Sequence, residues 1–165
     1  MSLDPAAFYH HGIVVADLES AVAAASREHG LTFTDPWVGT QRIRTPEGVQ
    51  EVEFRFVYSA EGPVHLELIQ QMPGTLWVTD GAAGIHHLGY WSDDVAADGA
   101  RLEAGGMALA FEHVPDEGQM SGYRYYRSAL GFYVELVHSS MRGPMEGMWA
   151  ATLLQAAAPG LPVSP

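Results

Sequence analysis

The chain has 165 residues, of which 47% are hydrophobic and 17% charged, and this composition predicts one globular domain with its own hydrophobic core. Its 20 acidic residues outnumber its 8 basic residues, so the formal net charge is −12, and we expect such a surface to repel nucleic acids and anionic membranes. Cysteine is absent and every basic residue is an arginine, which excludes disulfides, thiolate metal ligands and lysine nucleophiles.

The N-terminal region shows no pattern of a secretory leader, and no apolar run reaches the roughly 18 residues needed to span a bilayer. We therefore expect a soluble, cytoplasmic protein that acts on a small molecule.

The first half of the chain predicts one strand, one helix and then several strands. "FYHHGIVV" is a β-branched run typical of a strand, Asp17 is a helix N-cap, and Gly30 closes the helix that follows. The elements expected after it are strands at 31–38, 41–45, 49–59 and 64–70.

The second half repeats this order after a glycine-containing linker at 71–84. A strand at 85–92 precedes an N-cap at Asp94, and the further expected elements are a helix at 95–106 and strands at 107–113, 122–128 and 131–138. In the C-terminal tail, 139–165, residues 146–158 predict a short helix and 159–165 a frayed end.

The two halves are related by a repeat in which chemically important residues coincide. The matched pairs are His10 and His87, Gly12 and Gly89, Asp17 and Asp94, and Glu67 and Glu135. The fold class we predict is therefore α+β: two tandem βαβββ modules, at 8–70 and 85–138, form a curled mixed sheet, a cup, within a single domain.

Side chains alternate between the faces of a strand, and this alternation sorts the candidate residues. If the helices cover the faces that carry Ile13 and Leu88, then His10 and His87 lie on the open faces. In "LEL" and "VEL", the leucines and valine enter the core, which leaves Glu67 and Glu135 on the concave side of the sheet.

A carboxylate within an apolar strand is costly to bury unless it is paired. One divalent ion shared by His10, Glu67, His87 and Glu135 would remove that cost. Two nitrogen and two oxygen donors suit Zn, Ni, Co, Mn or Fe(II), and they leave coordination positions for a substrate, as in a catalytic site.

These residues carry a resemblance. "FYHHGIVVADLE" and "GIHHLGYWSDDV", with "LEL" and "VEL" ending the halves, resemble the vicinal oxygen chelate superfamily, which includes glyoxalase I, methylmalonyl-CoA epimerase, extradiol dioxygenases and bleomycin-resistance proteins. The resemblance spans residues 8–138 and is closest to the glyoxalase-like and epimerase-like members. Epimerases usually have glutamine where this chain has Glu67, and the N-terminal arginine phrase of glutathione-dependent glyoxalases is absent.

The resemblance implies one metal ion, held by His10, Glu67, His87 and Glu135, that acidifies the carbon beside a chelated carbonyl. Glu135 or Glu67 would then act as the catalytic base, and the enzyme would be a lyase, isomerase or epimerase.

For the substrate pocket, the open strand faces predict a mostly apolar lining by His65, Ile69, Trp91, Tyr133 and Val137. Arg55, Arg124 and Arg127 are candidates for binding a carboxylate or phosphate.

Two alternatives stay open at this point: a non-catalytic protein that binds a drug or metabolite in the same cup, and an iron-dependent extradiol-type dioxygenase. The sequence also leaves open whether the two halves close one cup within a chain or pair across a homodimer.

Overall fold

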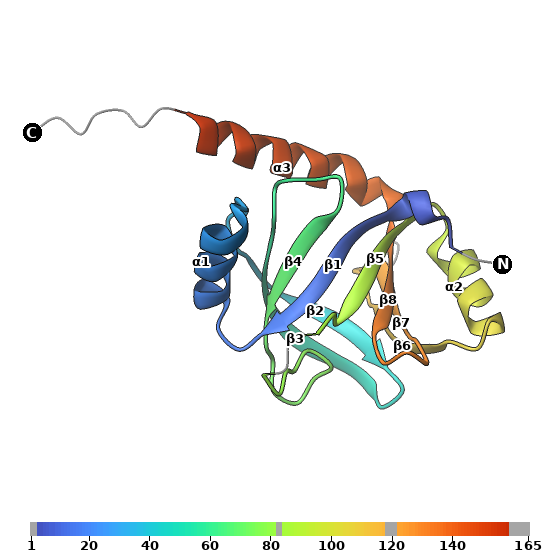
Figure 1. The fold of residues 1–165 in the computed structure, drawn as a ribbon. Helices are drawn as coiled ribbons and strands as arrows, with labels where there is room; N and C mark the ends of the chain where they lie inside the picture. The colour runs from blue at the N-terminus through green and yellow to red at the C-terminus, as the bar shows by residue number, and fades with distance from the viewer. Residues whose placement is uncertain (1–2, 82–83, 118–121, 159–165) are drawn as a thin grey trace, which may run out of the picture.

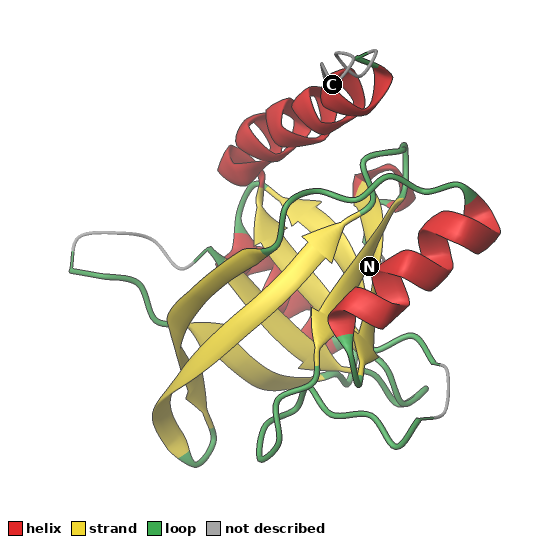
Figure 2. Ribbon diagram, turned by 90° about the vertical axis from the view of Figure 1, so that its left-hand side faces the viewer, coloured by secondary structure: helices red, strands yellow, loops and turns green. Residues whose placement is uncertain are grey.

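The structure, a computed structural model, describes residues 3–81, 84–117 and 122–158. Within these residues, eight strands form a closed barrel in the order β1-β4-β3-β2-β6-β7-β8-β5. Figure 1 shows the barrel with α1 and α2 on opposite sides and α3 across one end, and Figure 2 shows the strands enclosing the interior. The α+β class and the curled mixed sheet are as predicted, and the curling goes as far as closure.

The elements of the first half are β1 (Phe8–Val15), α1 (Leu18–His29), β2 (Trp37–Thr45), β3 (Gly48–Tyr58) and β4 (His65–Gln70). Those of the second half are β5 (His87–Ser92), α2 (Val95–Ala104), β6 (Ala108–His113), β7 (Tyr123–Arg127) and β8 (Tyr133–His138). The single turns η1 (Pro5–Ala7) and η2 (Ser139–Met141) flank the barrel, and α3 (Arg142–Ala157) follows η2.

Both helices of the barrel begin at the predicted caps. The Asp17 carboxylate accepts a hydrogen bond from the Ser20 N–H at 2.7 Å, and the Asp94 carboxylate accepts one from the Ala97 N–H at 2.9 Å. Gly30 ends α1 with a φ of 69°, a left-handed conformation that glycine adopts without steric cost.

Three predicted elements have bounds that differ by more than two residues from the structure. The strands predicted at 31–38 and 41–45 are one continuous strand, β2 (Trp37–Thr45). Residues 31–36 precede it and form only an isolated bridge at Phe33, since Pro36 has no N–H to donate to a ladder. Helix α3 begins at Arg142, before the predicted start at 146, because Pro144 lies in its first turn, where no backbone N–H is needed. The predicted frayed end at 159–165 lies outside the described residues.

The core is divided between the two faces of the barrel wall. Under α1, Leu18 packs with Leu68 and with Ile13 and Val15, the face that the sequence assigned to the helix. Under α2, Leu102 packs with Val134, Leu136 and Tyr90. The wall therefore turns its other face, with the histidines and glutamates, toward the interior. Among the described residues, none of the helices has the length and hydropathy needed to cross a membrane.

Candidate functional site

The register of four adjacent strands brings the candidate residues together. Parallel pairing of β1 with β4 places Gly12 opposite Glu67, and parallel pairing of β5 with β8 places Gly89 opposite Glu135. The antiparallel pair β1 and β5 joins these units, with His10 opposite Gly89 and His87 opposite Gly12. Each imidazole therefore lies across a glycine of the neighbouring strand.

The two glycines are required by this arrangement. A Cβ at Gly12 would lie 1.8 Å from Cε1 of His87, and a Cβ at Gly89 would lie 1.9 Å from Cε1 of His10. Both distances are far below carbon–carbon contact, and both histidines are fully buried. Glycine at these matched positions makes room for the two imidazole rings.

Four side chains converge in the interior. His10 Nε2 lies 2.8 Å from His87 Nε2, 3.5 Å from Glu67 Oε2 and 3.1 Å from Glu135 Oε2. His87 Nε2 lies 3.0 Å from Glu67 Oε2 and 3.4 Å from Glu135 Oε2. One donor atom from each of His10, Glu67 and His87 lies within 4.8 Å of the other two. We call His10, Glu67, His87 and Glu135 the central cluster.

Charges within the central cluster stabilise one another. Burial alone would lower the pKa of His87, but the carboxylates of Glu135 and Glu67 outweigh burial and raise this pKa to about 9. The pKa of His10 is raised by the same balance. Burial would raise the pKa of each glutamate, but the two histidines hold both values below the usual range. The two carboxylates are therefore ionised at neutral pH.

The donor set fits a divalent cation. Oε2 of Glu67 and Oε2 of Glu135 are buried without a hydrogen-bond partner among the described residues, although both point at the imidazoles. A cation between the four groups would satisfy both oxygens and balance the two negative charges.

His86 orients the ring of His87. Nε2 of His86 donates to the carbonyl of Leu76 at 3.2 Å, so its Nδ1 can accept from Nδ1 of His87 at 3.1 Å. Burial lowers the pKa of His86 to about 4, which keeps this ring neutral. When a metal ion displaces the proton from Nε2 of His87, the hydrogen bond to His86 would keep the remaining proton on Nδ1 and direct the Nε2 lone pair into the central cluster, the tautomer that a metal ligand needs.

Three tyrosine side chains pack around the central cluster. Tyr125 Oη lies 3.3 Å from His87 Nε2, and the rings of Tyr9 and Tyr58 contact that of His10. Burial, followed by the nearby carboxylates, raises the pKa of Tyr9, Tyr58 and Tyr125 well above its ordinary value. The three hydroxyls therefore stay protonated and able to donate hydrogen bonds.

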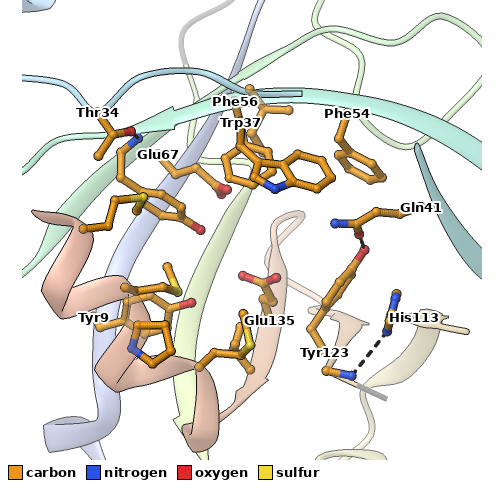
Figure 3. Close-up of a pocket in the computed structure, with 18 of the residues that line it drawn as sticks. Tyr9, Thr34, Trp37, Gln41, Phe54, Phe56, Glu67, His113, Tyr123 and Glu135 are labelled. Carbon is orange, nitrogen blue, oxygen red and sulfur yellow. Dashed lines mark hydrogen bonds between the residues drawn. The ribbon is translucent and has the colours of Figure 1, made fainter. Parts of the chain in front are cut away.

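A cavity of about 420 Å³ opens above the carboxylates. Glu67 and Glu135 both line it, as Figure 3 shows, and Trp37, Phe54 and Phe56 line one side. Helix α3 and the turn before it cover part of the opening with Met141, Pro144, Met145 and Met148. The carboxylates are thus accessible from a mostly apolar space.

Of the predicted pocket residues, Ile69 and Val137 line this cavity and His65 does not. His65 shares the inward face of β4, but its ring stacks on Trp149 of α3, with centroids 3.6 Å apart, and Nδ1 donates to the Ser59 carbonyl. Because α3 covers that end of the barrel, His65 supports the helix instead of facing a ligand.

Trp91 and Tyr133 also lie outside the cavity lining. A bulge in β1 at Tyr9 turns this residue inward beside His10, and Trp91 stacks on the outer side of its ring, with centroids 3.7 Å apart. Tyr133 packs against His86, with ring centroids 5.0 Å apart.

The predicted anion-binding arginines do not reach the cavity either. Arg55 pairs with Glu19 of α1, and Arg124 pairs with Glu112 at 2.9 Å. Arg127, exposed at the end of β7, is also absent from the lining. Their strands point Arg55 and Arg124 toward outer-face carboxylates, which are abundant in so acidic a chain.

Several lining residues were missed by the sequence interpretation. Trp77 is fully buried although it lies in the segment read as a linker, and it packs on Phe54 with ring centroids 4.6 Å apart. The presence of a large apolar tryptophan in this glycine-containing segment is the sequence feature that could have indicated a buried position. The methionines of α3 gave no signal in the sequence that they line the cavity, because only the fold shows which end of the barrel this helix covers.

The fold and the central cluster define a class of protein. Residues 9–126 match the family model described as the Glyoxalase/Bleomycin resistance protein/Dioxygenase superfamily, and the chain belongs to this superfamily. The predicted resemblance is thereby confirmed. No curated protein matches the chain.

Solved structures of methylmalonyl-CoA epimerases share the fold. One, in complex with methylmalonyl-CoA and NH4+, is 22% identical, with a TM-score of 0.54 over 81% of this chain and 94% of that one. A variant of the Streptomyces coelicolor epimerase in complex with 2-nitronate-propionyl-CoA is 21% identical, with a TM-score of 0.54 over 79% and 95%. The Mycobacterium tuberculosis epimerase is 17% identical, with a TM-score of 0.52 over 83% and 92%.

Proposed function

We propose that this protein is a metal-dependent enzyme that abstracts a proton from a carbon next to a carbonyl, as an isomerase, epimerase or lyase. The observation that carries the proposal is the convergence of two imidazoles with two ionised carboxylates that line an apolar cavity. The shared element order of the two halves supports the interpretation that they are tandem modules, each supplying one histidine and one glutamate.

The residues that would hold the ion are His10, Glu67, His87 and Glu135. A bound divalent ion would act as a Lewis acid on two neighbouring oxygens of the substrate. It would thereby lower the pKa of the C–H group next to the carbonyl. The nitrogen and oxygen donors favour Zn, Ni, Co, Mn or Fe(II), without selecting one of them.

Proton transfer is assigned to the glutamates. Glu135 and Glu67 are ionised and reach the cavity, so either can accept a proton from a substrate carbon held above them. Returning the proton to the opposite face of the same carbon inverts its configuration, and returning it to the neighbouring carbon isomerises the substrate. The same four residues serve both outcomes.

The tyrosines would complete the site. As the proton leaves, negative charge would develop on the substrate oxygen, and the protonated hydroxyls of Tyr9, Tyr58 and Tyr125, which all line the cavity, could donate hydrogen bonds to it. The apolar lining excludes water and strengthens these hydrogen bonds.

The first experiment measures metal content by elemental mass spectrometry on protein purified without a histidine tag. We expect about one divalent ion per chain, and its loss in the His10→Ala, His87→Ala double variant. His29→Ala, an exposed histidine at the end of α1, is the matched control and should retain the ion. Wild-type protein that holds no ion and takes up none of Zn, Ni, Co, Mn or Fe(II) would refute the proposal.

The second experiment follows exchange of substrate carbon-bound hydrogen with solvent deuterium by NMR, over a panel of α-hydroxy carbonyl compounds and acyl thioesters. Glu135→Gln keeps the shape of the side chain and removes the base, so exchange should fall by roughly 100–10,000-fold. Ligand binding without exchange in the wild type would identify a binding protein, and oxygen consumption with Fe(II) would identify a dioxygenase.

A further inference from the structure

We propose that the substrate of this site is an uncharged molecule whose part remote from the chelating oxygens is flat and apolar. This inference rests on the proposed function and narrows its substrate class: it excludes compounds that carry a carboxylate or phosphate into the cavity. Three observations support it, namely the chemistry of the lining, its charge and its shape.

The lining is aromatic and thioether-rich. Phe56 stacks on Trp37, with ring centroids 5.1 Å apart, and Trp77 sits edge-on to Phe54. Met145 and Met148 face the cavity from α3. Trp37 is 40% exposed and Met148 38% exposed, so apolar side chains border the opening as well as the interior. Flat rings and polarisable sulfur atoms favour a planar apolar ligand.

The charged groups of the lining are acidic. Asp35, Glu67 and Glu135 line the cavity, and among the described residues no arginine does. The residues outside the described ranges contain no arginine or lysine at all. A carboxylate or phosphate in the cavity would therefore be desolvated beside the carboxylates of the lining, with no arginine there to pair with it. The imidazoles of His10 and His87 lie outside the lining and are already paired with Glu135 and Glu67.

His113 is the one further basic side chain that lines the cavity within the described part of the chain. Its ring stacks on Tyr123, with centroids 5.2 Å apart, and burial lowers its pKa, so it is neutral at pH 7. Tyr123 in turn donates to the side-chain oxygen of Gln41 (Figure 3). These groups can hydrogen-bond to a neutral oxygen but supply no countercharge.

The shape limits size. At about 420 Å³, the cavity lies near the lower end of the roughly 300–1,000 Å³ usual for small-molecule sites. Trp149, which is buried against Tyr58 and His65, anchors α3 across this end of the barrel. A compact molecule of one or two rings fits this space.

The test compares two probes that present the same neighbouring oxygens. Phenacyl alcohol is uncharged, and its para-carboxylate analogue carries a negative charge at the far end of the ring. Binding is measured by tryptophan fluorescence and saturation-transfer NMR, on metal-free and metal-loaded protein alike. We expect the neutral probe to bind at least about tenfold more tightly in both forms, because burying an unpaired charge costs more than the 1.4 kcal/mol that corresponds to tenfold.

A charge placed in the lining should reverse this preference. Met148→Arg puts a cation at the partly exposed edge of the cavity and should bring the carboxylate probe to within about twofold of the neutral one. Leu154→Arg adds the same charge to the same helix at a 74% exposed position outside the lining, and should leave the ratio as in the wild type.

Equal or tighter binding of the carboxylate by the wild type, or binding of neither probe, would overturn the inference. Because both probes are scored by binding and not by turnover, a protein that binds phenacyl alcohol but exchanges no proton would refute the proposed reaction and leave this assignment of the cavity standing.

Discussion

Replacing Gly89 with alanine tests whether the imidazole of His10 needs the space left by this glycine. The added Cβ would lie 1.9 Å from Cε1 of His10, about 1.6 Å short of the roughly 3.5 Å at which two carbon atoms make contact. His10 is fully buried between Glu67 and Glu135, so its ring cannot swing toward solvent. The ring must leave its position in the central cluster.

Two effects of different size follow. Overpacking of a buried site costs typically about 1–3 kcal/mol, so Gly89→Ala should lower the free energy of unfolding of the metal-free protein by that amount. Disturbing a residue that only orients a metal ligand weakens metal binding by roughly 10–100-fold. Displacing a ligand should therefore weaken it by at least about 100-fold.

The assay is a competition titration of Zn, Ni or Co against a chelator of known affinity, combined with urea unfolding of the metal-free protein. Gly147→Ala is the control, because a Cβ there meets nothing within 4 Å and the position lies in α3. Gly12→Ala should reproduce the loss through His87. Wild-type affinity in Gly89→Ala would show that His10 does not bind the metal from the position described, and would refute the reasoning.

Three further predictions concern stability. Removing the ion with a chelator should lower Tm by roughly 5–10 °C, since a ligand at 100 times its Kd stabilises by about 2.7 kcal/mol; an unchanged Tm in differential scanning calorimetry would argue against a bound ion. Trp149→Ala should cost about 3 kcal/mol in urea unfolding and increase hydrogen exchange along α3, whereas Leu154→Ala should stay within about 0.5 kcal/mol; equal costs would contradict the anchoring role. Asp94→Ala removes the α2 cap and should cost about 1 kcal/mol, and Asp94→Asn should restore most of it.

Local patterns in the sequence predicted most of the elements. The caps at Asp17 and Asp94 and the left-handed end at Gly30 depend on hydrogen bonds and steric limits within a few residues of chain, so they can be read without the fold. Two boundaries were predicted wrongly near a proline. Pro36 directly precedes β2, and Pro144 lies in the first turn of α3, where a proline is tolerated.

The repeat made the central cluster predictable. His10, Glu67, His87 and Glu135 lie together because each half places its histidine and its glutamate on the inward face of adjacent strands. Alternation along a strand assigns these faces. The coincidence of the two halves singled out His10 and His87 among the eight histidines, and Glu67 and Glu135 among the acidic residues. The pairing of β1 with β5, which joins the two halves edge to edge in one sheet, has no local signal.

The cavity lining depended on contacts that no local pattern encodes. The bulge at Tyr9 turns this residue inward beside His10, α3 lies over the barrel end that holds His65, and acidic neighbours retain Arg55 and Arg124 on the outer face. By itself, the sequence determined the strands and helices, their caps and the four residues of the central cluster, because local steric and hydrogen-bonding rules apply separately within each half. Only the tertiary structure decided how the barrel closes and which side chains line its cavity, because strand pairing and helix docking depend on the packing of residues far apart in the chain.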